Sequence, residues 1–73
     1  MSAELQVLPY RDGWDVIYES ARNAESHHAT RDTAVVAACA QARRDGAVLV
    51  TFDRDGNEIA RHDYGSALAG WIA

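Results

Sequence analysis

The histidines are the first residues whose chemistry needs a test, because imidazole is a common ligand of zinc. His27 and His28 are adjacent, and His62 lies far along the chain. If residues 27 and 28 are extended, their side chains point to opposite faces, so the pair cannot readily chelate one ion. Zinc also needs further ligands at defined spacing, and Cys39 falls on the core side of a predicted helix. We therefore interpret the histidines as solvated or hydrogen-bonded and expect no metal site.

Residues 53–58, DRDGNE, resemble a piece of a calcium-binding loop. Aligning Gly56 with the glycine of such a loop places Thr51 at the first ligand position. It also places His62 at about the twelfth position, where a bidentate glutamate belongs. The motif fails at both ends, and the composition is typical of a β-hairpin turn.

A nucleophile would come from Cys39, or from a serine acting with His62 and Asp63. Cys39 lies between alanines within the predicted helix, where a small core residue is expected. No nucleophile elbow accompanies His62 and Asp63, and a chain this short does not easily enclose a substrate pocket. The sequence therefore predicts a protein that is not an enzyme and has no catalytic residue and no cofactor.

Arginines suggest an alternative, a nucleic-acid contact surface, on which Trp14 or Tyr18 would stack against bases. The candidate contacts are Arg31, Arg43, Arg44 and Arg54. Aspartates interleave with these arginines, and the net charge of −4 disfavours nonspecific binding to a phosphate backbone. Nucleic-acid binding therefore stays open as the second hypothesis.

The element that must position most of these residues is a helix predicted over residues 30–46. Thr30 is a suitable N-cap, and Gly46 suits a left-handed C-cap after basic residues in the last turn. Apolar residues recur with helical spacing and form a core-facing stripe. The stripe consists of Ala34, Val35, Ala38, Cys39 and Ala42.

Val36, Ala37 and Ala40 fall on the other side of this helix and form a small apolar patch. Such a patch can mark an interface, but alanine is also simply a good helix former. Both interpretations stay open.

Strands are predicted on either side of the helix, at residues 5–8, 14–19, 47–52 and 58–64. Tyr10 to Gly13 has turn chemistry, with Gly13 free to adopt a positive φ. Residues 26–29 extend only briefly before the helix. The predicted fold is α+β with the order β-β-α-β-β, an antiparallel sheet with one helix packed on one face. One helix covers one face, so residues such as Leu49 or Ile17 need another cover.

Length and composition limit the other possibilities. Seventy-three residues form a single domain over residues 1–73, and a chain of this size buries only about 60% of its unfolded surface. A single cysteine excludes an intrachain disulfide, which leaves association as a source of stability. We see no secretion signal or membrane span, and expect a cytoplasmic protein without membrane contact.

The order of the short motifs resembles a family of small bacterial proteins, domain of unknown function 2188 (DUF2188). The matching residues are Leu8-Pro9, Asp12-Gly13-Trp14, Thr30, Ala34-Val35, Ala38, Leu49-Val50, Asp55-Gly56 and Asp63-Tyr64-Gly65. The resemblance covers residues 5–65, leaves a tail over residues 66–73, and implies a compact α+β domain of bacterial or phage origin without an assigned activity.

Together these patterns predict a non-enzymatic domain that self-associates as a homodimer and acts by binding another protein of unknown identity, which is our first hypothesis. The interface candidates are Val36, Ala37, Ala40, Leu49, Leu68, Trp71 and Ile72.

Overall fold

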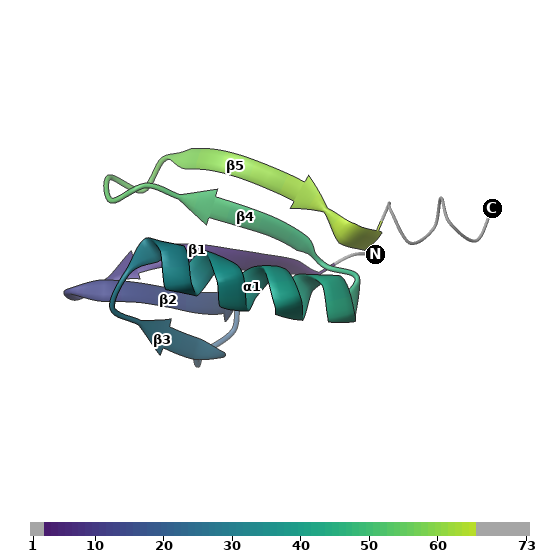
Figure 1. Cartoon of the computed structure of the whole chain (residues 1–73), viewed down its shortest axis with the longest axis horizontal. Coiled ribbons are helices and arrows are strands. Elements are labelled where there is room, and N and C mark those ends of the chain that lie inside the picture. Colours follow the sequence, from purple (N-terminus) through teal and green to yellow (C-terminus); the bar gives the residue numbers. More distant parts are fainter. Residues whose placement is uncertain (1–2, 66–73) are drawn as a thin grey trace.

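The computed structural model describes residues 3–65, which form a helix packed on one face of a five-stranded sheet (Figure 1). The predicted α+β class is therefore confirmed. In chain order the elements are β1 (Glu4–Tyr10), β2 (Gly13–Tyr18), β3 (Ser26–His28), α1 (Arg31–Asp45), β4 (Val48–Phe52) and β5 (Glu58–Asp63). Across the sheet the strands lie in the order β3-β2-β1-β4-β5.

The sheet differs from the prediction in its strands and in one direction. Residues 26–28 form the strand β3, which pairs antiparallel with β2 and which the predicted order omitted. β1 pairs in parallel with β4, so the sheet is mixed rather than antiparallel. The reason is the connection: α1 carries the chain back along the sheet before β4 begins, and a crossover of this kind joins parallel strands.

The prediction that Gly13 adopts a positive φ in the turn between β1 and β2 is wrong. The left-handed residue there is Arg11, with φ 56°. Gly13 instead begins β2, where a Cβ atom would lie 2.4 Å from the backbone oxygen of His28. The position requires glycine because β3 approaches it closely.

Both predicted ends of α1 are confirmed. The Thr30 hydroxyl accepts a hydrogen bond from the backbone N–H of Thr33 at 3.2 Å. At the other end Gly46 adopts φ 66°, and its backbone N–H donates to the carbonyl of Ala42. These caps satisfy backbone groups that a helix otherwise leaves unpaired.

The core lies between α1 and the sheet. Alternate residues of the central strands face the helix, and they are Leu5, Val7, Trp14, Val16 and Leu49. From α1 they meet Ala34, Ala38 and Ala42, which are fully buried, while Val35 and Cys39 are partly buried beside them. Leu49 is therefore covered by its own helix, so we withdraw it as an interface candidate. Alanines at this contact let the helix axis lie close to the sheet.

Candidate functional site

The outer side of α1 carries the predicted apolar patch. Val36 is 71% exposed, Ala40 is exposed, and Ala37 is half-buried. Val36 and Ala37 line a shallow hollow of about 360 Å³ together with Asp32 and Thr33 of α1 and His28 of β3. We call this hollow and the adjoining edge of β3 the α1–β3 groove. The sequence predicted its helix residues, but not the strand that forms its other wall.

The sheet face opposite α1 is the second candidate surface, and we call it the open face. In Figure 1 the helix lies on the other side of the sheet, and no described element covers this one. The register places the following apolar residues on it: Leu8, Tyr10, Ile17, Val48, Val50 and Phe52. Ile59 lies at the register shift between β4 and β5, and the alternation of side chains along β5 places it on the side opposite Ala60, which pairs with Thr51. Tyr10 is 49% exposed and Ile59 is 50% exposed. The sequence predicted a strand at residues 47–52 with apolar residues on both sides. It left Leu49 on the side that the helix does not cover, whereas the structure places Val48, Val50 and Phe52 on that side.

Three charged side chains on the open face, Glu4, Glu58 and Arg61, neutralise one another. Arg61 lies 2.8 Å from a carboxylate oxygen of Glu58 and 3.6 Å from one of Glu4. Glu4 also accepts a hydrogen bond from the Gln6 amide at 2.7 Å. The hydrogen bond from Arg61 lowers the pKa of Glu58. Val50 pairs across the sheet with Gln6 and Arg61, and it is fully buried among these neighbours.

A hollow of about 340 Å³ lies on the open face where β1, β2 and the connection from β2 to β3 meet. Leu8 and Ile17 contribute apolar side chains, Tyr10 and Asp15 are also in the lining, and Arg22 comes from the connection to β3. This surface can therefore receive an apolar group near a positive charge.

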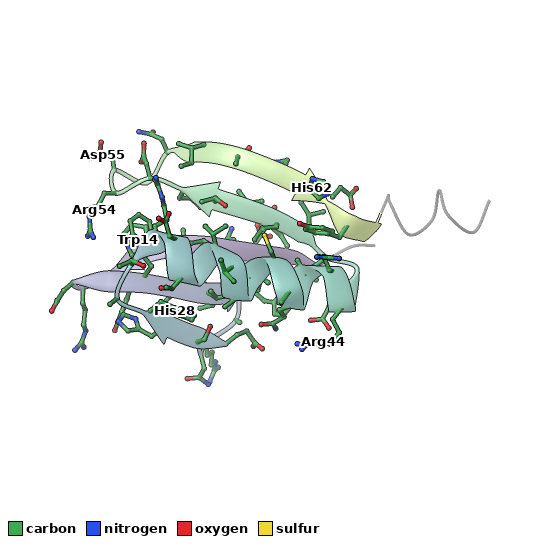
Figure 2. The ribbon with its side chains drawn as sticks, viewed as in Figure 1. Trp14, His28, Arg44, Arg54, Asp55 and His62 are labelled. Atoms are coloured by element: carbon green, nitrogen blue, oxygen red, sulfur yellow. The ribbon has the colours of Figure 1, made fainter. Side chains whose placement is uncertain are left out.

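The arginines predicted to contact nucleic acid separate into two places. The guanidinium carbons of Arg31 and Arg54 lie 5.8 Å and 5.1 Å from the centroid of the Trp14 ring. Figure 2 shows Arg54 and Trp14 at one end of α1 and Arg44 at the other. Trp14 is only 5% exposed, so its ring is unavailable for stacking on a base.

Tyr18, the other predicted stacking residue, is engaged within the fold. Its hydroxyl donates a hydrogen bond to the carboxylate of Asp45. Burial, together with this carboxylate, raises the pKa of Tyr18 to about 12. The contact joins the end of β2 to the last turn of α1.

The histidines of β3 face opposite sides of the sheet, as the alternation of a strand predicts. Nδ1 of His27 lies 2.5 Å from a carboxylate oxygen of Asp15 on the open face. Nε2 of His28 lies 2.8 Å from the hydroxyl of Ser26 on the helix side. Among residues 3–65 there is no group of three or more side chains suited to hold a metal ion.

Cys39 and the segment that resembles a calcium loop also have structural contacts. Cys39 is partly buried against the core, and its hydrogen bond with Tyr64 raises the pKa of the tyrosine. The Asp53 carboxylate accepts hydrogen bonds from the backbone N–H groups of Asn57 and Asp55, both at 2.9 Å. The hydrogen bond from Asn57 is the main reason why the pKa of Asp53 is lowered. These side chains stabilise a packed helix and a hairpin turn.

The interface candidates Leu68, Trp71 and Ile72 lie outside the described residues. Within the part of the chain that the structure describes, no helix has the length and apolar character needed to cross a membrane.

Comparison with known proteins gives one result. A family model described as "Uncharacterized protein conserved in bacteria (DUF2188)" matches residues 5–64, nearly the whole described region. No curated protein and no solved structure matches the chain.

Proposed function

We propose, from the premise that this chain belongs to the uncharacterised bacterial family DUF2188, that it is a non-enzymatic domain that self-associates and acts through protein–protein interaction. The open face carries the proposal. It combines exposed Tyr10 and Ile59 with partly exposed apolar residues on strands between them. A homodimer and a cytoplasmic location stay predictions of the proposal.

A second copy of the chain suits the part of the open face formed by β1, β4 and β5, because the charges of Glu4, Glu58 and Arg61 there are already paired. Glu4, Glu58 and Arg61 contact one another, so covering them does not leave an isolated charge without a partner, which would be costly. Sheets that pack face to face lie about 10 Å apart and interdigitate apolar side chains. A stable interface buries roughly 800 Å² on each partner. The open face spans all five strands of the sheet, so it is a broad surface on which such an interface can form.

Light scattering behind a sizing column tests this proposal. We expect a mass above the monomer value of 8.0 kDa at micromolar concentrations, and a shift toward that value on dilution. Ile59→Lys places a charge on the open face at a half-exposed position and should weaken association about tenfold or more. The matched control is Val36→Lys on the outer side of α1, which should leave the mass unchanged because the proposal assigns self-association to the open face and not to the predicted helix patch. A monomeric mass for the wild type up to hundreds of micromolar would overturn self-association.

Nucleic-acid binding is the second candidate, and one observation favours it. Within the described residues, Arg31 and Arg54 form no ion pair and converge at one end of the fold. Phosphate contacts by these side chains would make binding to DNA or RNA steeply dependent on salt. Fluorescence anisotropy with labelled single-stranded and double-stranded probes tests this, and no change at low ionic strength would remove the hypothesis.

A further inference from the structure

The α1–β3 groove is separate from the open face and has a different chemistry. β3 is an edge strand of the sheet within residues 3–65, so one side of its backbone has no strand partner there. The hollow beside it is lined by His28 from β3 and by Asp32, Thr33, Val36 and Ala37 from α1. Figure 2 shows His28 where β3 lies next to α1. A free strand edge and an apolar hollow therefore adjoin.

The apolar lining of the hollow suits an aliphatic side chain. Its volume is about 360 Å³, at the lower end of the range of roughly 300–1,000 Å³ for ligand pockets. Val36 supplies an apolar wall and is 71% exposed, the highest value among the exposed large hydrophobic residues of the described chain. A side chain placed against it would be removed from water.

Two carboxylates lie at the apolar hollow or beside it. Asp32 lines the hollow itself, and Glu25 immediately precedes β3, where its carboxylate accepts a hydrogen bond from Gln41 of α1 at 2.8 Å. No arginine side chain is among the described residues that line the hollow. The guanidinium of Arg31, the neighbour of Asp32, lies over the Trp14 ring instead. The groove is therefore complementary to a basic ligand.

We propose that the α1–β3 groove binds an extended basic peptide segment of a partner protein, which adds as a strand to the free edge of β3. Strand addition provides main-chain hydrogen bonds, and alternate side chains supply specificity. An aliphatic side chain of the segment fills the hollow beside Val36. Lysine or arginine side chains two positions away on either side reach Asp32 and Glu25. This inference rests on the proposed function as an interaction domain and names the class of partner.

The length of β3 limits the affinity. The strand has three residues, so it offers few backbone hydrogen bonds to an added strand. We expect a dissociation constant between roughly micromolar and millimolar for a short peptide, which also loses conformational freedom when it binds.

Nuclear magnetic resonance titration of the isotope-labelled full chain tests the groove. The probe is an acetylated, amidated peptide Thr-Lys-Thr-Val-Thr-Lys-Thr, in which lysine, valine and lysine point to the same side of a strand. We expect it to shift the backbone amides of residues 25–28 and the methyl groups of Val36 and Ala37. Replacing its lysines with glutamate, or its valine with asparagine, should weaken binding about tenfold each.

Two lysine substitutions at exposed apolar positions provide the matched variants. Val36→Lys should weaken binding of the lysine peptide about tenfold or more, because it fills the hollow and repels the peptide. Ile59→Lys, on the open face, should leave peptide affinity unchanged. The same two variants have the opposite effects in the light-scattering experiment, so the groove and self-association are tested independently.

Three results would overturn the groove proposal. The first is an absence of shifts at millimolar peptide, and the second is equal affinity for the glutamate peptide. The third is movement of the groove signals with protein concentration alone, which would identify a second copy as the occupant. A chain that self-associates but shows any of these results refutes the groove and leaves the proposed function standing.

Discussion

At the scale of single residues, Gly13 has much less room for a side chain than Gly56. A Cβ atom there would lie 2.4 Å from the backbone oxygen of His28 and 2.9 Å from Nε2 of His27. Backbone cannot move aside as easily as the end of a flexible side chain. The residue therefore holds β3 against β2, and with it one wall of the α1–β3 groove.

We expect Gly13→Ala to lower the free energy of unfolding by about 1–3 kcal/mol, the usual cost of inserting atoms into a packed position. Chemical denaturation measures the loss, and faster hydrogen exchange at residues 25–28 should accompany it. Gly56→Ala is the comparison, because nothing lies within 4 Å of a Cβ there and only its φ of +86° is unfavourable. Unchanged exchange at residues 25–28 in Gly13→Ala would contradict the assigned role.

Tyr18 should make stability depend on pH in alkaline solution. Its pKa in the folded chain is about 12, above the ordinary value of 10.0, because burial and Asp45 favour the neutral hydroxyl. Its contribution is therefore complete below pH 10 and is lost as the pH rises toward 12. Tyr18→Phe should cost about 1 kcal/mol near neutral pH, and it should flatten the decline between these limits. Denaturant titrations at several pH values measure both effects.

At the scale of elements, α1 depends on small side chains at its contact with the sheet. Ala34, Ala38 and Ala42 are fully buried, so the helix lies close to the strands and no space remains for a longer side chain. These three positions are therefore alanine because the helix lies close to the sheet, and not only because alanine favours helix formation.

Ala38→Leu should destabilise the fold by about 1–3 kcal/mol through overpacking. Ala40→Leu, at an exposed position of the same helix, should change the free energy of unfolding by less than about 0.5 kcal/mol. Thermal and chemical denaturation of both variants provide the measurement. Equal effects would mean that the helix does not pack as described.

Elements with local signals could be predicted from the sequence, and those set by distant contacts could not. Thr30 and Gly46 mark the ends of α1 with residue types that act locally. β3 has the sequence SHH, without β-branched residues, and is a strand because it pairs with β2. The run at residues 47–52 is apolar on both sides, so only its register with β1 decides that Leu49 faces the helix and Val50 the open face.

For the candidate surfaces too, local sequence signals predicted some residues, and contacts distant in sequence determine the rest. Helical spacing predicted that Val36 and Ala37 lie away from the core, and the structure places them there. The groove itself needs β3 as its second wall, and the sequence predicted only a brief extension at residues 26–29, not its pairing with β2. The open face likewise depends on which side of the sheet α1 covers.

At the scale of the whole molecule, the core is small and lies on one side of the sheet. The buried hydrophobic residues of the described chain fall between Leu5 and Val50, before the tail at residues 66–73. We expect Trp71→Ala to weaken self-association more than folding, because the sequence predicts Trp71 as an interface residue of the tail. Light scattering and denaturation of the same variant separate the two effects. A large loss of stability with unchanged mass would assign Trp71 to the fold of a single chain.

The parallel pairing of β1 with β4 also determines the order in which the chain can fold. The antiparallel pairs β1–β2 and β4–β5 form between neighbouring segments, but Leu5 meets Leu49 only after the ends of a long loop come together. Loop closure of this kind is entropically costly, and contacts distant in sequence slow folding. On the ribosome, β1 therefore emerges with one edge unpaired and keeps it exposed until residues 48–52 have been synthesised.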